Sequence, residues 1–462
     1  MKASNWVDRL LDRAYGPSQR NKRIKVLINP FGGKGKAAKL YIHEIEPIFA
    51  AARCEVDAES TKYSGHAVEI AAALDINAYD VIASASGDGL PHECINGLAK
   101  KPNAAEALRK VAVVQLPCGS GNAMSWNLNG TANCSLAALN IVKGVRTPLD
   151  LVSVTQGHSR TLSFLSQSLG VVAESDLGTD NLRWMGDARF YVGFLVRLLG
   201  KTQYPCDIAV KMEISTKQDI KRHYAQQVTR MERTPQILES GRDQASDDTT
   251  WQGLPPLKYG TVLDPLPTDA GWTPLIHYPH LGNFYCGNMT FMAEDAPFFP
   301  ASLPTDGLLD FVTVPGNISR LKAINLLFSV PQGTFFDQDS VNVSKVSAMR
   351  VVPRYGRRAE KHAREQGQSR LGQVLNGGNA ARDEGYFSVD GEKMPFEPFQ
   401  IEVHRALGTV LSRRPGIYEY SGPKGWEDFL DRVADELDHA NVTASGNSHA
   451  NTESVGTAGS AA

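Results

Sequence analysis

The chain lacks several features that would assign it to a class at once. No run of about 18 apolar residues occurs, so no membrane-spanning helix is expected. The N-terminus has no apolar core of a secretion signal. The six cysteines lie far apart without a C-x-x-C pair, which favours reduced thiols over a disulfide framework or a zinc site. The expected location is therefore cytoplasmic, with at most peripheral membrane association.

Charge of either sign is also not in excess. The sequence has 48 Lys and Arg residues against 50 Asp and Glu residues, with a formal net charge of -2. A protein that binds nucleic acid through bulk charge would be strongly basic. No nucleic-acid partner is expected.

Glycine, in contrast, is concentrated in three turns that each follow a predicted strand. Three glycine-rich turns each follow an apolar run of strand length, at residues 23–28, 79–83 and 111–116. Without a Cβ, glycine lets phosphate groups approach backbone N–H groups closely. None of the turns matches the common P-loop, and each alone could be a linker or an ordinary turn. Because ligands bind at the carboxyl ends of parallel strands, the three together predict a phosphate-binding edge of the sheet.

The order of the predicted elements indicates two kinds of fold. Strands alternate with helices in the first part, which predicts an α/β domain with a mostly parallel sheet. Later strands follow one another with few helices, which predicts a β-rich, antiparallel, sandwich-like domain. The expected divisions are a lead-in at 1–21, the α/β domain at 22–148, the β-rich domain at 149–415 with insertions at about 215–275 and 354–385, a C-terminal helix at 416–440 and a disordered tail at 441–462.

Asp88 is the candidate catalytic residue. It lies between Gly87 and Gly89, after a short apolar strand and before a helix that Pro91 suits at its first position. A strand, a glycine turn and a helix N-terminus form a place to bind an anion and move a proton. The alternative is that Asp88 only caps the following helix.

The turns together resemble the lipid kinase family that contains diacylglycerol, ceramide and sphingosine (long-chain base) kinases. Further stretches that match are Phe299 to Asp310 and Val389-Asp390-Gly391-Glu392. The likeness covers about residues 22–420 except the insertions. Within the family the chain looks most like a sphingosine kinase, because of Ser86, the turn from Gly119 to Asn122 and the stretch from Gly170 to Leu177.

This resemblance implies an ATP-dependent kinase that phosphorylates the primary hydroxyl of a sphingoid base, with Asp88 as general base. Magnesium is expected as well, brought in through the Asp390-Gly391-Glu392 element, but its ligands are not assignable. The residues implied in ATP binding are Asn29, Pro30, Phe31, Gly32, Gly33, Thr61, Ser86, Gly87, Gly89, Gly119, Ser120, Gly121, Arg183, Arg189, Asp390, Gly391 and Glu392.

The resemblance also implies how the lipid is bound. Asp176 would pair with the ammonium group of the sphingoid base, and Ser86 would contact the substrate. Since that lipid resides in a bilayer, transient membrane contact is expected. The basic loop at 354–385 is one candidate for it, against the alternative of a solvated loop. A ceramide or diacylglycerol kinase, or a non-catalytic lipid-binding relative, remains an alternative, and the oligomeric state is not predicted.

Overall fold

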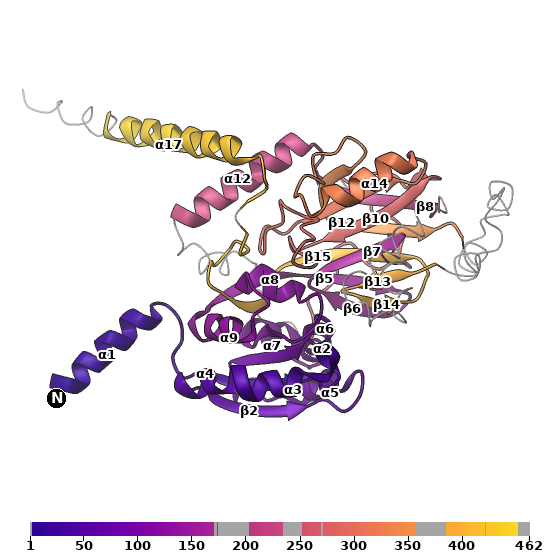
Figure 1. Cartoon of the computed structure of the whole chain (residues 1–462). Helices are drawn as coiled ribbons and strands as arrows, with labels where there is room; N and C mark the ends of the chain where they lie inside the picture. The colour runs from indigo at the N-terminus through magenta and orange to yellow at the C-terminus, as the bar shows by residue number, and fades with distance from the viewer. Residues whose placement is uncertain are drawn as a thin grey trace, which may run out of the picture.

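The computed structural model describes residues 2–170, 173, 203–233, 252–268, 271–355, 385–420 and 422–450. It contains a parallel sheet and a larger antiparallel sheet, one below the other in Figure 1. The predicted fold class, an α/β part followed by a β-rich antiparallel part, is confirmed.

The first sheet has four parallel strands in the order β2-β1-β3-β4. Strands β1, β3 and β4 are almost entirely buried because helices cover both faces of a parallel sheet. Edge strand β2 is mostly exposed and carries acidic side chains, which discourage pairing with another chain. The strands are β1 (Arg23–Ile28), β2 (Glu55–Ser60), β3 (Val81–Ser86) and β4 (Ala112–Pro117).

Short helices connect these strands. The first, α1, stands apart from both sheets at the left of Figure 1. The helices of this part are α1 (Lys2–Tyr15), α2 (Gly32–Gly35), α3 (Ala37–Leu40), the π-helical turn η1 (Tyr41–Ile45), α4 (Glu46–Ala51), α5 (His66–Ala73), α6 (Gly89–Leu98), α7 (Ala104–Lys110), α8 (Ala123–Asn129) and α9 (Cys134–Lys143).

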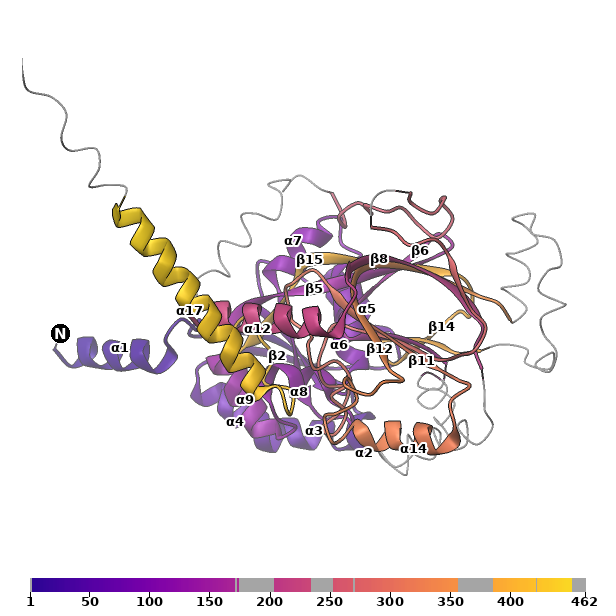
Figure 2. The same ribbon diagram turned by 90° about the horizontal axis from the view of Figure 1, so that it is seen from above.

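The second sheet has 11 strands and curls strongly, as the view from above shows (Figure 2). Its main path is β14-β13-β7-β10-β11-β12-β15-β5-β6, and β8 and β9 branch from β12. The strands are β5 (Val145–Gln156), β6 (Ser159–Ser163), β7 (Ser166–Gly170), β8 (Cys206–Ile214), β9 (Ile276–Tyr278), β10 (Leu281–Gly287), β11 (Leu309–Pro315), β12 (Asn342–Pro353), β13 (Phe387–Val389), β14 (Glu392–Met394) and β15 (Phe399–Ser412). Helices α12 (Lys217–Arg233), α14 (Arg320–Ser329) and α17 (Glu427–Ala450) complete this part.

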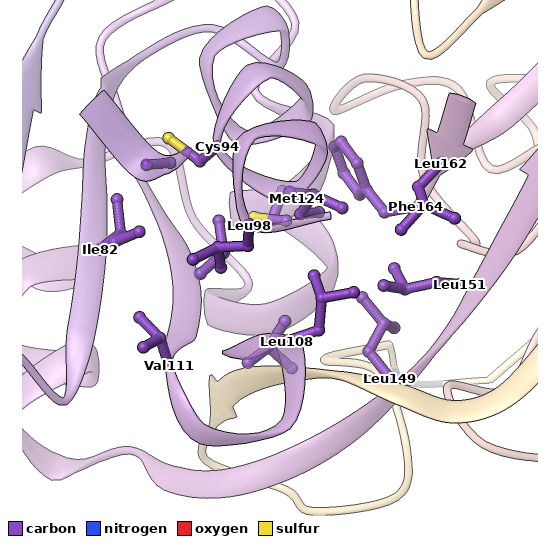
Figure 3. Close-up of a cluster of buried hydrophobic side chains, with 14 of the residues drawn as sticks. Ile82, Cys94, Leu98, Leu108, Val111, Met124, Leu149, Leu151, Leu162 and Phe164 are labelled. Carbon is purple, nitrogen blue, oxygen red and sulfur yellow. The ribbon is translucent and has the colours of Figure 1, made fainter. Parts of the chain in front are cut away.

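One hydrophobic core joins the two sheets (Figure 3). Residues of the parallel part, such as Ile82 and Leu98, belong to the same buried cluster as Leu149, Leu151 and Phe164 of the antiparallel part. Burying apolar surface on both sides of a boundary fixes the two parts against each other. Groups from both sheets can therefore hold fixed positions in one site.

The C-terminal helix differs from its expected bounds of 416–440. Helix α17 begins only at Glu427, because Gly422 and Gly425 have positive φ values that a right-handed helix excludes. It continues to Ala450, into the stretch expected as a disordered tail, with no proline to end it. Residues 451–462 lie outside the described residues.

The two expected insertions are described only in part. The first contains α12, whose residue Tyr224 packs edge-on against Trp426 just before α17. Residues 234–251, which include the expected disordered tip, and residues 356–384 of the second insertion lie outside the described residues. All six cysteines are free, as expected. No helix in the described ranges is long and apolar enough to cross a bilayer.

Candidate active site

The three glycine turns meet at the carboxyl edge of the parallel sheet. The first turn reaches the second, since a Cβ built on Gly32 would lie 3.7 Å from the Cα of Ser86. The second contacts the third even more closely, since a Cβ on Gly119 would lie 2.3 Å from the Cα of Gly87. Only glycine allows that approach. The predicted convergence of the turns is therefore present in the fold.

Side chains close two of these turns locally. Asn29 Oδ1 accepts the N–H of Phe31 at 3.0 Å, and the N–H of Gly32 donates to the backbone oxygen of Asn29. Asn122, in the left-handed region at φ 53°, accepts the N–H of Gly119 at 2.8 Å and donates back to its carbonyl at 2.9 Å. The backbone is thus preorganised, although these N–H groups are already used within the turns.

Asp88 lies where the second and third turns meet. It occupies the N-cap position of α6 but makes no side-chain capping bond there. Its carboxylate instead accepts the N–H groups of Ala123 at 2.9 Å and Met124 at 3.0 Å, in the first turn of α8. Gln115 Nε2 donates to it at 3.2 Å. The carboxylate therefore holds the third turn, not the helix that follows it.

The environment of Asp88 suits a proton acceptor. Burial raises the pKa of its carboxyl, the hydrogen bonds from Met124, Ala123 and Gln115 oppose that rise, and the charge of Asp390 adds to it. A carboxylate has about four lone-pair positions, and the three donors leave room for one more hydroxyl. Asp88 is thus held rigidly and can still accept a proton.

Asp390 has a different environment from the one its place in the resemblance implies. It is only 3% exposed, and donors surround both oxygens of its carboxylate. The five donors are Ser163 Oγ, the backbone N–H groups of Phe164, Leu165 and Ser166, and Nδ1 of His92. A carboxylate whose lone pairs are all engaged in this way has none left for a cation. Asp390 ties the β6–β7 turn to helix α6.

His92 is one of the residues that join the two parts of the molecule. Its Nδ1 lies 2.8 Å from Asp390 Oδ2, across 298 residues of sequence. Burial alone would lower the pKa of His92, but the hydrogen bond and charge of Asp390 outweigh it and raise that pKa. One turn further along α6, Asn96 exchanges two hydrogen bonds of 2.8 Å with the backbone of Leu162. Helix α6, which follows Asp88, is therefore fixed to the antiparallel sheet.

Glu392 is the carboxylate of the Asp390-Gly391-Glu392 element that reaches the site. A Cβ built on Gly89 would lie 2.8 Å from Glu392 Oε1, so this exposed side chain lies against the residue after Asp88. Among the described residues no group of three or more His, Cys, Asp or Glu side chains could hold a metal ion. Magnesium commonly takes only one or two carboxylates and completes its shell with phosphate oxygens and water. Glu392 fits that role, and Asp390 does not.

Some of the remaining predicted site residues lie within the described residues, and others lie outside them. Thr61, at the end of β2, is buried beside the first turn, and its N–H donates to Ile28 at 2.8 Å. Phe31 is 81% exposed. Ser86 donates its hydroxyl to the Gly87 carbonyl at 2.6 Å. Asp176, Arg183 and Arg189 lie outside the described residues.

Sequence reasoning missed Gln115. Its Nε2 donates to Asp88, and its Oε1 accepts the N–H of Ser125 at 2.8 Å, so it links the carboxylate to α8. The sequence feature that could have identified Gln115 is its position as the single amide side chain in strand β4, which is otherwise apolar and is fully buried. Buried polar side chains need partners, so such a residue marks a structured polar contact.

The stretch from Phe299 to Asp310, part of the resemblance to the lipid kinase family, contributes two buried carboxylates. Asp306 and Asp310 lie 3.4 Å and 3.3 Å from Nζ of Lys345, which is fully buried. His223 of α12 also contacts Asp306, at 3.1 Å. Buried charges persist in proteins where they are paired. These two carboxylates are therefore paired with a lysine of β12 within the antiparallel part of the molecule.

Comparison with known proteins agrees with this geometry. Residues 23–154 match the model of the diacylglycerol kinase catalytic domain. The chain is 35% identical to sphingoid long chain base kinase 5 of Saccharomyces cerevisiae, over 88% of this chain and 61% of that protein. It is 34% identical to sphingoid long chain base kinase 4 of Schizosaccharomyces pombe, over 90% of this chain and 80% of that protein. The chain thus spans less than two thirds of the first of these relatives.

A solved structure shows the same fold. The crystal structure of a putative diacylglycerol kinase from Bacillus anthracis aligns with a TM-score of 0.55 at 16% identity and covers 86% of this chain. The sequence matches place the chain in a family of lipid kinases. The chain belongs to the family with the diacylglycerol kinase catalytic domain, and within it to the sphingoid long-chain base kinases.

Proposed function

We propose that the protein transfers the γ-phosphoryl group of ATP to the primary hydroxyl of a sphingoid long-chain base. The observation that carries this proposal is the position of Asp88, held at the junction of two glycine turns with room for one more hydrogen bond. Phosphoryl transfer needs positioning and charge neutralisation more than covalent help from the protein. The fixed carboxylate and the close-packed turns at this edge of the sheet support the positioning role.

Asp88 acts as the general base in this proposal. The lipid hydroxyl donates to the carboxylate oxygen that has a lone pair left, and its proton passes to Asp88 as the hydroxyl oxygen attacks the γ-phosphorus. The bond from that phosphorus to the β–γ bridging oxygen breaks, and ADP leaves. The N–H groups of Ala123 and Met124 keep the carboxylate from rotating away. A base held within about 2.6–3.2 Å of its proton contributes roughly 10² to 10⁴ in rate.

The nucleotide lies across the three turns from Asn29, Ser86 and Gly119, with Thr61 toward the adenine and ribose. Arg183 and Arg189 would contact phosphate oxygens, which match the fork of a guanidinium group. Magnesium, when bound, neutralises charge on the phosphate oxygens. Glu392, against Gly89, is the residue that would hold it.

The ammonium group of the substrate distinguishes the branches of the family. Asp176 would pair with it, and Ser86, one residue before Gly87, would contact the lipid near the reacting hydroxyl. Ceramide and diacylglycerol carry no such cation. The matches to sphingoid base kinases over most of the chain favour the amine substrate.

The first test is a kinase assay with ATP and a panel of sphingosine, sphinganine, phytosphingosine, ceramide and diacylglycerol. We expect turnover of the three amines and little of the other two. Asp176→Asn should impair turnover of the amines selectively. Turnover of diacylglycerol above that of every amine would refute the sphingoid-base assignment.

A second test addresses the base itself. Asp88→Asn should reduce kcat by about 10³-fold, because general-base catalysis is lost, and should leave binding of a fluorescent ATP analogue nearly unchanged. The matched control is Asp75→Asn, an exposed aspartate of the same part of the chain. Turnover of the Asp88 variant within a few-fold of wild type would remove Asp88 from the chemistry.

A further inference from the structure

Two cysteines face each other behind the third glycine turn. Cys118 is the residue before Gly119, and Cys134 is the first residue of α9. Their sulfur atoms lie 3.9 Å apart, although the two residues are 16 positions apart in the chain. Cys134 Sγ donates to the carbonyl of Pro117 at 3.3 Å, so the hydrogen between the two sulfur atoms comes from the Cys118 thiol. The two thiols are therefore placed to react with each other.

Cys134 has two features of a reactive thiol. It lies at the N-terminus of a ten-residue helix, where the helix dipole favours a negative charge. The hydrogen bond from Cys118 lowers the pKa of Cys134, and it outweighs burial and the charge of Glu44, which act in the opposite direction. Burial instead raises the pKa of Cys94 and of Cys206. Cys134 is therefore the thiol of the pair that ionises first.

Both thiols are buried, but surface residues lie next to them in the chain. Cys118 is 2% exposed and Cys134 is 4% exposed. Ser120, two residues after Cys118, and Asn133, directly before Cys134, are exposed. An oxidant that reaches this pair must be small, and hydrogen peroxide is close to water in size. Its reaction with a thiolate gives a sulfenic acid, which a neighbouring thiol converts to a disulfide.

We propose that Cys118 and Cys134 are a modification site, at which hydrogen peroxide forms a reversible disulfide bond. The Cys134 thiolate attacks one peroxide oxygen, the O–O bond breaks, and the hydroxide that leaves takes up the thiol proton as water. The sulfur of Cys118 then attacks the sulfenic sulfur of Cys134. The S–S bond forms, the S–O bond breaks, and the leaving hydroxyl departs as a second water with the proton of Cys118. Two thiols are thus oxidised and one peroxide is reduced to two waters.

The bond would act on the second and third glycine turns. The two sulfur atoms must approach from 3.9 Å to about 2 Å. The N–H of Cys118 donates to the carbonyl of Ser86 at 3.1 Å. The next residue, Gly119, packs against Gly87, so a shift of Cys118 is passed to the second turn. Because a misplacement of about 1 Å can cost roughly 10²-fold in rate, we expect oxidation to weaken nucleotide binding and turnover, and this consequence rests on the proposed function.

Mass spectrometry of the intact full chain tests the bond itself. Treatment with hydrogen peroxide should remove two hydrogen atoms and two free thiols. Digestion without reductant should then yield two peptides joined through Cys118 and Cys134, and dithiothreitol should restore both thiols. A disulfide between other cysteines would overturn the proposal. So would an unchanged mass, or oxygen added to either thiol without a disulfide.

Single alanine variants test the order of attack. In Cys118→Ala the sulfenic acid of Cys134 has no thiol partner, so dimedone, a reagent for sulfenic acids, should label Cys134. In Cys134→Ala the remaining Cys118 should stay unlabelled. The matched control is Cys94→Ala, which removes another buried cysteine of the same part and should form the bond as wild type does. Labelling of Cys118 but not of Cys134 would overturn the assignment of the attacking thiol.

Binding of a fluorescent ATP analogue tests the consequence for the site, with each protein compared with its own reduced form. Oxidation should weaken binding about tenfold in wild type and Cys94→Ala, and less than about twofold in Cys118→Ala and Cys134→Ala. A disulfide that leaves binding unchanged would overturn the control of the site. If wild type phosphorylates no sphingoid base, yet the bond forms and is reversed, the proposed function fails and the modification site remains. Normal turnover without the bond gives the opposite result.

Discussion

Asp88 and Asp390 are two aspartates in glycine turns whose carboxylates differ in burial and in the number of hydrogen bonds they accept. Both follow a short strand and precede a glycine, and both accept backbone N–H groups. Asp88 has three donors and is half-buried. Asp390 has five donors and is 3% exposed. The first carboxylate retains acceptor capacity, and the second is saturated.

The difference shows that a motif does not by itself assign chemistry to its carboxylate. Asp390, just after β13, accepts hydrogen bonds from the β6–β7 turn and from His92 of α6, and so joins these elements. The carboxylate that lies beside Asp88 is that of Glu392, against Gly89. Asp88 accepts hydrogen bonds from Gln115 of β4 and from two N–H groups of α8. We therefore expect Asp390 substitutions to act mainly on stability and Asp88 substitutions mainly on the rate of phosphoryl transfer.

The largest stability effect is expected for Asp390→Asn. The amide keeps the shape of the side chain but turns an NH2 group toward donors that need an acceptor. Leaving buried donors unpaired, with His92 among them, should lower the free energy of unfolding by about 3 kcal/mol or more. Urea denaturation of the full chain measures this loss.

Asp88→Asn is the natural control for that experiment. It should cost only about 1 kcal/mol in unfolding, because fewer donors depend on it and a partly desolvated charge is removed. The assignment of a mainly structural role to Asp390 would be contradicted if Asp390→Asn were as stable as wild type, or if Asp88→Asn were the less stable of the two variants.

The contact between the second and third turns provides a smaller, geometric test. Gly119→Ala would place a Cβ 2.3 Å from the Cα of Gly87, where backbone must move. Gly87→Ala would place a Cβ 3.5 Å from the Cα of Gly119, an ordinary contact. We expect Gly119→Ala to cost about 2 kcal/mol in unfolding and Gly87→Ala less than half of that. Equal losses would show that the turns are not in the close contact described here.

Much of the site on the parallel sheet could be predicted from the sequence because its determinants are local. Each glycine turn directly follows its strand, and the donors to Asp88 lie within 36 residues of it. The rule that parallel strands share a ligand-binding edge then brings the turns together. The role of Asp88 as a link to α8 was missed because a neighbouring helix, not its own, supplies the donors.

The antiparallel part could be predicted only as a set of strands. Contacts that hold it join residues far apart in sequence, such as His92 with Asp390 and His223 with Asp306, 298 and 83 residues apart. A single sequence contains no signal for such pairings, since any buried base could meet any buried acid. The Asp390 environment therefore could not be foreseen, although the residue itself was selected.

The smallest predicted effect couples the two aspartates through pH. Because burial raises the pKa of Asp88, and the charge of Asp390 raises it further, the acid limb of kcat should lie above the usual value of 3.8. Activity is lost as pH falls through that pKa, since a base must be ionised. Asp390→Asn removes the negative charge, so its acid limb should move to lower pH by less than about one unit. The measurement is the pH profile of kcat for wild type and Asp390→Asn, over the pH range in which both proteins remain folded, with Asp75→Asn as a control whose acid limb should not shift. An acid limb of Asp390→Asn that moved to higher pH or stayed in place would contradict the coupling.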